Sequence, residues 1–61
     1  MSEEIIRGLK QEIETAEAQM AELLKMIEIA AKAGEDVTSL KAKYLNVKAK
    51  VDRWKKALSS A

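Results

Sequence analysis

The side chains best suited to chemistry in the first half of this sequence are three glutamates, Glu14, Glu17 and Glu28. Carboxylates that project from facing helices can bridge metal ions inside a bundle. Such sites also use histidine, usually in a Glu-x-x-His spacing, and this sequence contains no histidine and no cysteine. We therefore expect a solvated acidic face, with no metal site and no cofactor.

The hydroxyl groups of Thr15, Thr38 and Ser39 are the candidate nucleophiles. A hydroxyl becomes a nucleophile only beside a base, and no Ser-His-Asp set and no glycine-rich phosphate loop occur in the sequence. These residues are expected to be surface or helix-capping groups. No catalytic residue is predicted, and we do not expect an enzyme.

Basic side chains gather in the second half of the chain. Seven acidic residues stand against four basic ones up to Ala33, whereas seven basic residues stand against Asp52 alone from Val37 onward. Most of these basic side chains flank an apolar stripe, where they would face the acidic half, so pairing between the halves is the favoured interpretation. Contact with RNA or DNA phosphates is the alternative, and its candidate residues are Lys43, Lys50, Arg53 and Lys56.

Two long amphipathic helices are predicted to carry all of these residues. Apolar residues recur in alternating steps of three and four along residues 3–33 and again along residues 37–59, which is the spacing of a coiled-coil seam. Ser2 is the expected N-cap of the first helix, and residues 59–61 are expected to fray. The predicted hairpin core consists of Ile13, Ala16, Met20, Leu23, Ile27, Ala30, Leu40, Tyr44, Val47, Val51, Trp54 and Leu58.

The helical pattern is interrupted only at residues 34–36. Gly34 can adopt the left-handed conformation that ends a helix, and Asp36 can accept hydrogen bonds from the free N–H groups of the next helix. Folding the chain here places Ala16 opposite Trp54 and brings Glu17 near Lys55. The predicted fold is all-α, an antiparallel helical hairpin that forms one domain over residues 1–61.

Apolar residues beyond the seam exceed what two helices can cover. A chain of 61 residues also buries too little surface to be stable by burial alone, and without disulfides or metals the remaining aid is oligomerisation. The simplest arrangement is an antiparallel dimer of hairpins that forms a four-helix bundle, and a higher oligomer is the alternative. The predicted oligomer interface consists of Ile5, Ile6, Leu9, Leu24, Met26, Ile29, Ala42, Leu45 and Ala49.

These features favour a non-enzymatic module that acts through protein contacts, as an adaptor, inhibitor or assembly component that binds copies of itself. Two alternatives stay open: RNA or DNA binding by the basic second helix, and a role as one subunit of a heteromeric helical bundle. No apolar run approaches the roughly 20 residues that span a bilayer, so we expect a soluble protein that does not enter membranes. The lack of cysteine fits a cytoplasmic location.

The predicted architecture resembles two kinds of helical hairpin. One is the small plasmid regulator that dimerises to bind paired RNA loops, and the other is the group of hairpin co-chaperones of secretion needles. The resemblance lies in the arrangement of two helices and not in a residue pattern, so it implies a fold and carries no function.

Overall fold

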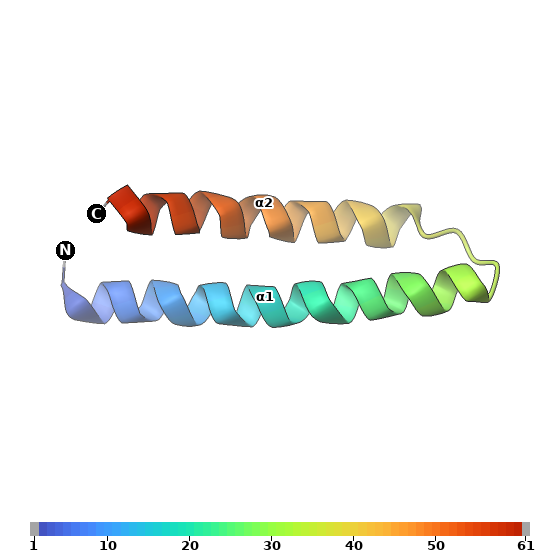
Figure 1. The fold of residues 1–61 in the computed structure, drawn as a ribbon, viewed down its shortest axis with the longest axis horizontal. Helices are drawn as coiled ribbons and strands as arrows, with labels where there is room; N and C mark the ends of the chain where they lie inside the picture. Colours follow the sequence, from blue (N-terminus) through green and yellow to red (C-terminus); the bar gives the residue numbers. More distant parts are fainter. Residues whose placement is uncertain (1, 61) are drawn as a thin grey trace.

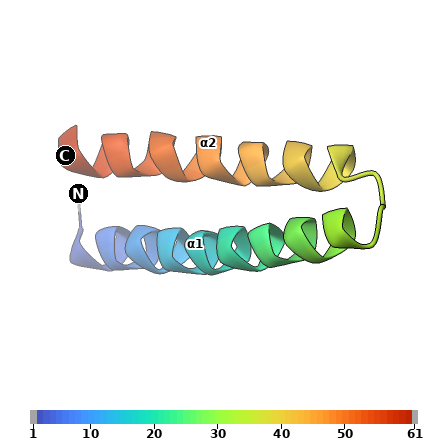
Figure 2. The ribbon, with the colours of Figure 1, turned by 45° about the vertical axis from the view of Figure 1, so that its right-hand side comes forward.

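The chain folds as two antiparallel helices, α1 (Glu3–Lys32) and α2 (Thr38–Ser60), as seen in a computed structural model that describes residues 2–60. The helices lie side by side, with α1 extending beyond α2 at both ends, and the start of α1 and the end of α2 lie opposite the turn (Figures 1 and 2). The molecule is 48 Å long and only 15 and 12 Å across. This confirms the predicted helical hairpin.

The start and end of α1 follow from its capping residues. The Ser2 hydroxyl accepts a 3.4 Å hydrogen bond from the N–H of Ile5, which confirms Ser2 as the N-cap. At the other end Gly34 has a φ of +78°. This left-handed residue lets its own N–H and that of Glu35 donate to the carbonyls of Ala31 and Ala30, at 3.1 and 2.9 Å. These two bonds form a Schellman motif that closes the helix.

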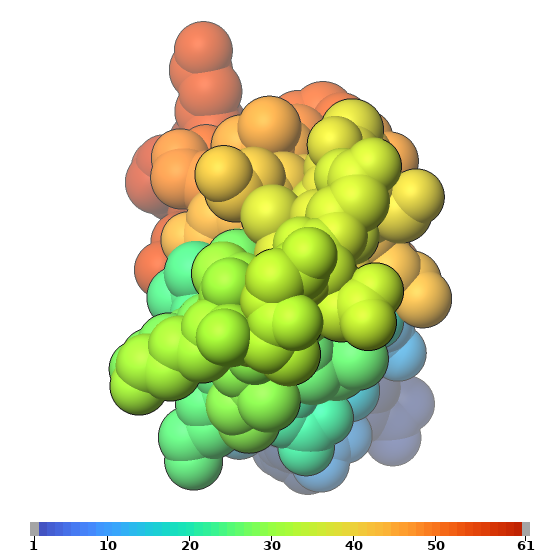
Figure 3. All heavy atoms as spheres, turned by 90° about the vertical axis from the view of Figure 1, so that its right-hand side faces the viewer, coloured from blue at the N-terminus to red at the C-terminus, as the bar shows by residue number. Residues whose placement is uncertain are grey.

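The first turn of α2 is capped by Asp36. Its carboxylate accepts hydrogen bonds from the N–H of Thr38 at 2.9 Å and from the Thr38 hydroxyl at 2.6 Å. The turn runs across the end of the two helices in the end-on view (Figure 3). Both predicted helix boundaries at the turn are corrected by one residue, because Ala33 is the C-cap of α1 and the first intrahelical acceptor of α2 is the carbonyl of Val37.

The far end of α2 is more regular than its sequence suggests. Ser59 and Ser60 were expected to fray, yet both are helical, so α2 ends one residue later than predicted. Their hydroxyls donate to the carbonyl of Lys56 at 2.9 and 3.1 Å. Both hydroxyls therefore bond back to the helix backbone about one turn earlier. Ala61 lies outside the described residues.

The core between the helices is a single seam. Every residue of the predicted hairpin core is buried or half-buried, and the most buried are Ile13, Ala16, Leu23 and Val51. Trp54 packs against the cluster that Ala16 forms with Ile13 and Val51. Small and large side chains therefore interdigitate, as close packing between helices requires.

The first turns of α1 are better covered than the sequence indicates. We expected nothing in the same chain to cover Ile5, Ile6 and Leu9, but Ile6 and Leu9 are half-buried and only Ile5 is largely exposed. The reason is helical spacing, since Ile6, Leu9 and Ile13 follow one another by three and four residues and so continue the seam. The seam face of α1 therefore extends almost to its N-terminus.

Candidate protein-binding surface

Four large apolar side chains are exposed in the half of the hairpin nearest the turn. Leu24 and Met26 are each 50% exposed, Leu45 is 60% exposed and Ile29 is 68% exposed. We call these four residues the turn-half patch. The one other large hydrophobic residue that is comparably exposed among residues 2–60 is Ile5, near the N-terminus of α1. Uncovered apolar side chains are therefore concentrated in one half of the molecule.

The contact between Glu17 and Lys55 shows that the patch residues lie at the same level of the hairpin. Lys55 Nζ lies 2.8 Å from Glu17 Oε2, so these two residues mark one level on the two helices. Seven residues closer to the turn, Leu24 on α1 is level with Lys48 on α2. Leu45 is three residues further and falls between the levels of Leu24 and Ile29. Around α1, Met26 and Ile29 are three residues apart and share one side, whereas Leu24 is two residues from Met26 and lies on the opposite side. The four side chains therefore form a band around the turn half and not a cluster on one face.

The small residues of the predicted interface lie next to this band. Ala42 and Ala49 are exposed on α2, three residues before and four residues after Leu45, so all three lie on one side of the helix. This side faces away from α1, because Tyr44 and Val47 occupy the side that packs against it. Small residues on an outer face permit close approach of another helix.

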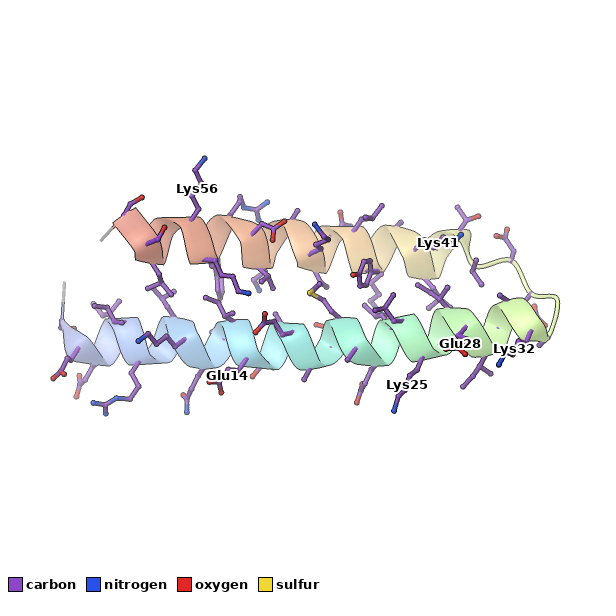
Figure 4. All side chains as sticks on the ribbon, viewed as in Figure 1. Glu14, Lys25, Glu28, Lys32, Lys41 and Lys56 are labelled. Carbon is purple, nitrogen blue, oxygen red and sulfur yellow. The ribbon has the colours of Figure 1, made fainter. Side chains whose placement is uncertain are left out.

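Charged residues occupy the outer sides of both helices. Lys25 points away from α2, as Glu14 does further along α1, and Lys56 points away from α1 (Figure 4). Glu28 and Lys32 form an exposed ion pair of 3.4 Å on α1, and Lys48 and Asp52 form one of 3.3 Å on α2. Exposed pairs one helical turn apart contribute only about 0.3 to 0.5 kcal/mol each.

The three glutamates considered for metal binding are separated. Glu17 is bound to Lys55 on the other helix, Glu28 is bound to Lys32, and Glu14 points outward into solvent. Within residues 2–60, no three acidic side chains lie close enough together to hold a metal ion.

The basic residues of α2 fall into two groups. Lys50 is half-buried, and its ammonium lies 4.6 Å from the centroid of the Trp54 ring, in a cation–π contact. The spacing of four residues could have predicted this contact. Lys43, Arg53 and Lys56 are exposed and make no ion pair within residues 2–60. The structure therefore leaves three of the four predicted phosphate-contacting residues free, while Lys50 packs on the tryptophan.

A shallow depression lies at the start of α1, lined by Glu3, Ile6, Arg7 and Lys10. All four residues come from two turns of one helix, so the depression is an open space between neighbouring side chains. No helix in the described part of the chain combines the length and apolarity needed to cross a membrane.

Comparison of the chain with protein-family models, curated proteins and solved structures finds no match. The proposed function rests on the surfaces of the two helices.

Proposed function

We propose that this protein is a non-enzymatic protein–protein interaction module, and that its primary partner is a second copy of the same hairpin. The assembly would bury one side of the turn-half patch and form a four-helix bundle. In this role the hairpin acts as an adaptor, an inhibitor or an assembly component.

The observation that carries the proposal is the exposure of Leu24, Met26, Ile29 and Leu45, each at least half accessible to solvent. A single exposed leucine needs no explanation, but four large apolar residues exposed within one half of a small hairpin are more than isolated surface residues, and apolar surface of this kind marks interaction sites. Among residues 2–60 only four side chains are buried, and none of them completely. Burial of the patch against a partner would add the apolar contact that a chain of this size lacks.

The test is the molar mass of a double variant, Leu24→Glu with Met26→Glu, measured by light scattering behind size exclusion. We expect an oligomer for the unaltered protein and a helical monomer for the variant, because two carboxylates cannot be buried without partners. The control is Gln11→Glu with Gln19→Glu, which adds the same two charges at exposed positions of α1 outside the patch. An unaltered protein that is monomeric at all concentrations would overturn the proposal.

A second candidate function is supported by the exposed, unpaired side chains of Lys43, Arg53 and Lys56 on α2. Three such cations on one helix can neutralise phosphates of RNA or DNA, and the affinity would then fall steeply with salt. Titration of structured RNA and duplex DNA at two salt concentrations tests this candidate. Absence of binding at the lower concentration would remove it.

A further inference from the structure

We infer that the two hairpins of the proposed dimer lie with their turns at the same end, so that α1 of each copy packs beside α2 of the other. This inference rests on the proposed function and adds the orientation of the partner. It differs from the antiparallel arrangement of hairpins that is simplest from the sequence. Three properties of the structure support it: the position of the apolar residues, the charge of each helix and the area that the dimer must bury.

The first property is the position of the turn-half patch. A two-fold dimer places the same surface of both copies in contact, so a patch can cover itself only where the two copies overlap at the same level. With the turns at opposite ends, the patch of one copy would face the open half of the other. The open half, residues 2–19 and 50–60, exposes just one large apolar side chain, Ile5. With the turns at one end, the side of the turn-half patch that faces the partner meets the same side of the other copy.

The second property is the segregation of charge between the helices. Two hairpins related by a two-fold axis with their turns at opposite ends place each helix beside its own copy. Acidic α1 would then lie against acidic α1, and α2, with seven basic residues and one acidic residue, against α2. When the turns lie at one end, the two-fold axis runs parallel to the helices and each α1 lies beside the partner's α2. The acidic excess of α1 lies in residues 3–19, so opposite charges then meet between the open half of each α1 and the partner's α2.

The third property is the area available for contact. A stable interface of standard size buries about 800 Å² per partner. The hairpin is 48 Å long and 15 Å wide, so one complete long face is comparable in area to such an interface. A staggered dimer that overlapped only in its turn halves would cover about half of that face, which is too small. Full overlap with the turns together satisfies the requirements of area, apolar contact and charge at once.

Spin labels at the two ends of the hairpin test this orientation. The chain has no cysteine, so Glu35→Cys labels the exposed turn and Ser59→Cys labels the exposed open end, each in a separate sample. Distances between labels on the two copies are measured by pulsed electron resonance. For turns at one end, we expect both positions to give short distances, well under half of the 48 Å length of the hairpin.

The other outcomes separate the orientation from the proposed function. Distances near 48 Å at both positions, in a protein of dimeric mass, would show turns at opposite ends and overturn this inference while self-association stands. A short distance at residue 35 with a long one at residue 59 would show a staggered dimer and would also overturn it. A monomeric mass with no distance between labels would overturn the proposed function itself.

Salt dependence provides an independent measurement. The contact of α1 with the partner's α2 is attractive, so we expect the dimer to dissociate more readily when the salt concentration rises from about 50 to about 500 mM and the Debye length shrinks. We expect the dissociation constant to increase severalfold. A dimer of the opposite orientation brings like charges together, so its dissociation constant would fall with added salt, and that result would contradict the inference.

Discussion

Glu17 on α1 accepts a hydrogen bond of 2.8 Å from the ammonium of Lys55 on α2. This is the only ion pair within residues 2–60 that joins the two helices, since the other two pairs are one turn apart on a single helix. The two residues are 38 positions apart in the sequence. Their contact therefore favours this alignment of α1 and α2 over one in which α2 is shifted along α1 by a helical turn. The sequence predicts this contact from the register of the seam.

Reversing one charge of this pair should lower the thermal midpoint of unfolding, and reversing both should restore it. Glu17→Lys places two ammonium groups together, as Lys55→Glu does with two carboxylates, whereas the double variant rebuilds an attractive pair. Circular dichroism at a fixed protein concentration measures the midpoints. Strictly additive effects of the two substitutions would show that the pair is not coupled in solution.

The same pair predicts a response to alkaline pH. The hydrogen bond and the negative charge of Glu17 raise the pKa of Lys55 above its usual 10.5. A raised pKa in the folded state means that the stabilisation is fully present below pH 10.5 and is lost as the pH rises through the folded value. The control is Glu17→Gln, which should remove most of this alkaline sensitivity. If the stability of the unaltered protein and that of Glu17→Gln depended equally on alkaline pH, the assignment of this sensitivity to the Glu17–Lys55 pair would be contradicted.

Adjacent leucines should respond oppositely to the same substitution. Leu23 is 5% exposed in the seam, so Leu23→Ala removes buried methyl groups and should cost about 2 to 5 kcal/mol, enough to unfold much of a hairpin of this size. Leu24 is half exposed, so Leu24→Ala should leave the helical content of the hairpin nearly unchanged and reduce its self-association. Urea unfolding and light scattering on both variants check this. Equal loss of helix in both would contradict the placement of Leu24 outside the core.

The sequence predicts the hairpin and its core well because both depend on local rules. Alternating steps of three and four apolar residues place a seam on each helix, and Gly34 and Asp36 have few roles other than closing one helix and opening the next. The structure differs from the prediction where the burial of a side chain depends on three-dimensional packing. The spacing of Ile6, Leu9 and Ile13 places them on the seam face. Their half-burial could not be predicted by counting the residues by which the first helix is longer than the second.

The surface of the hairpin is less predictable than its core. Lys50 was a candidate phosphate contact only in the alternative hypothesis of nucleic-acid binding, and it packs on Trp54, because a long side chain can turn along the helix toward an aromatic ring four residues away. In contrast, the excess apolar residues near the turn are evident from the sequence. What the structure adds is their common level on both helices, on which the proposed orientation of the partner rests.

The cap at the start of α2 should show its own acid sensitivity. Hydrogen bonds from the hydroxyl and then the N–H of Thr38 lower the pKa of Asp36 below its usual 3.8. A lowered pKa means that the stabilisation is present above pH 3.8 and is lost as the pH falls through the folded value. Thr38→Val keeps the backbone bond and removes the hydroxyl bond, so the Asp36 pKa should rise part of the way, as measured by NMR titration of the carboxyl carbon. An unchanged pKa would show that the hydroxyl does not bind this carboxylate in solution.

The two glycines of the chain should respond with opposite signs to replacement by alanine. Gly8 lies inside α1, and a Cβ placed there meets no atom of the hairpin within 4 Å. Gly8→Ala should therefore stabilise the protein by about 1 kcal/mol, because alanine favours the helical conformation. Gly34 also has open space around it, but its φ of +78° disfavours any side chain, so Gly34→Ala should cost about 1 to 2 kcal/mol. Urea unfolding of both variants at equal concentration measures the two effects.

A different result at Gly8 would reveal a contact that the single hairpin does not contain. If Gly8→Ala lowered stability, or if it reduced the oligomeric mass while the helical content stayed the same, the open space beside Gly8 would have to be occupied by the backbone of another copy. Gly8 lies in the open half of the hairpin, far from the turn-half patch. Such a result would extend the interface along the whole of α1, as full overlap of two hairpins allows, and would exclude a dimer that meets only at its turn halves.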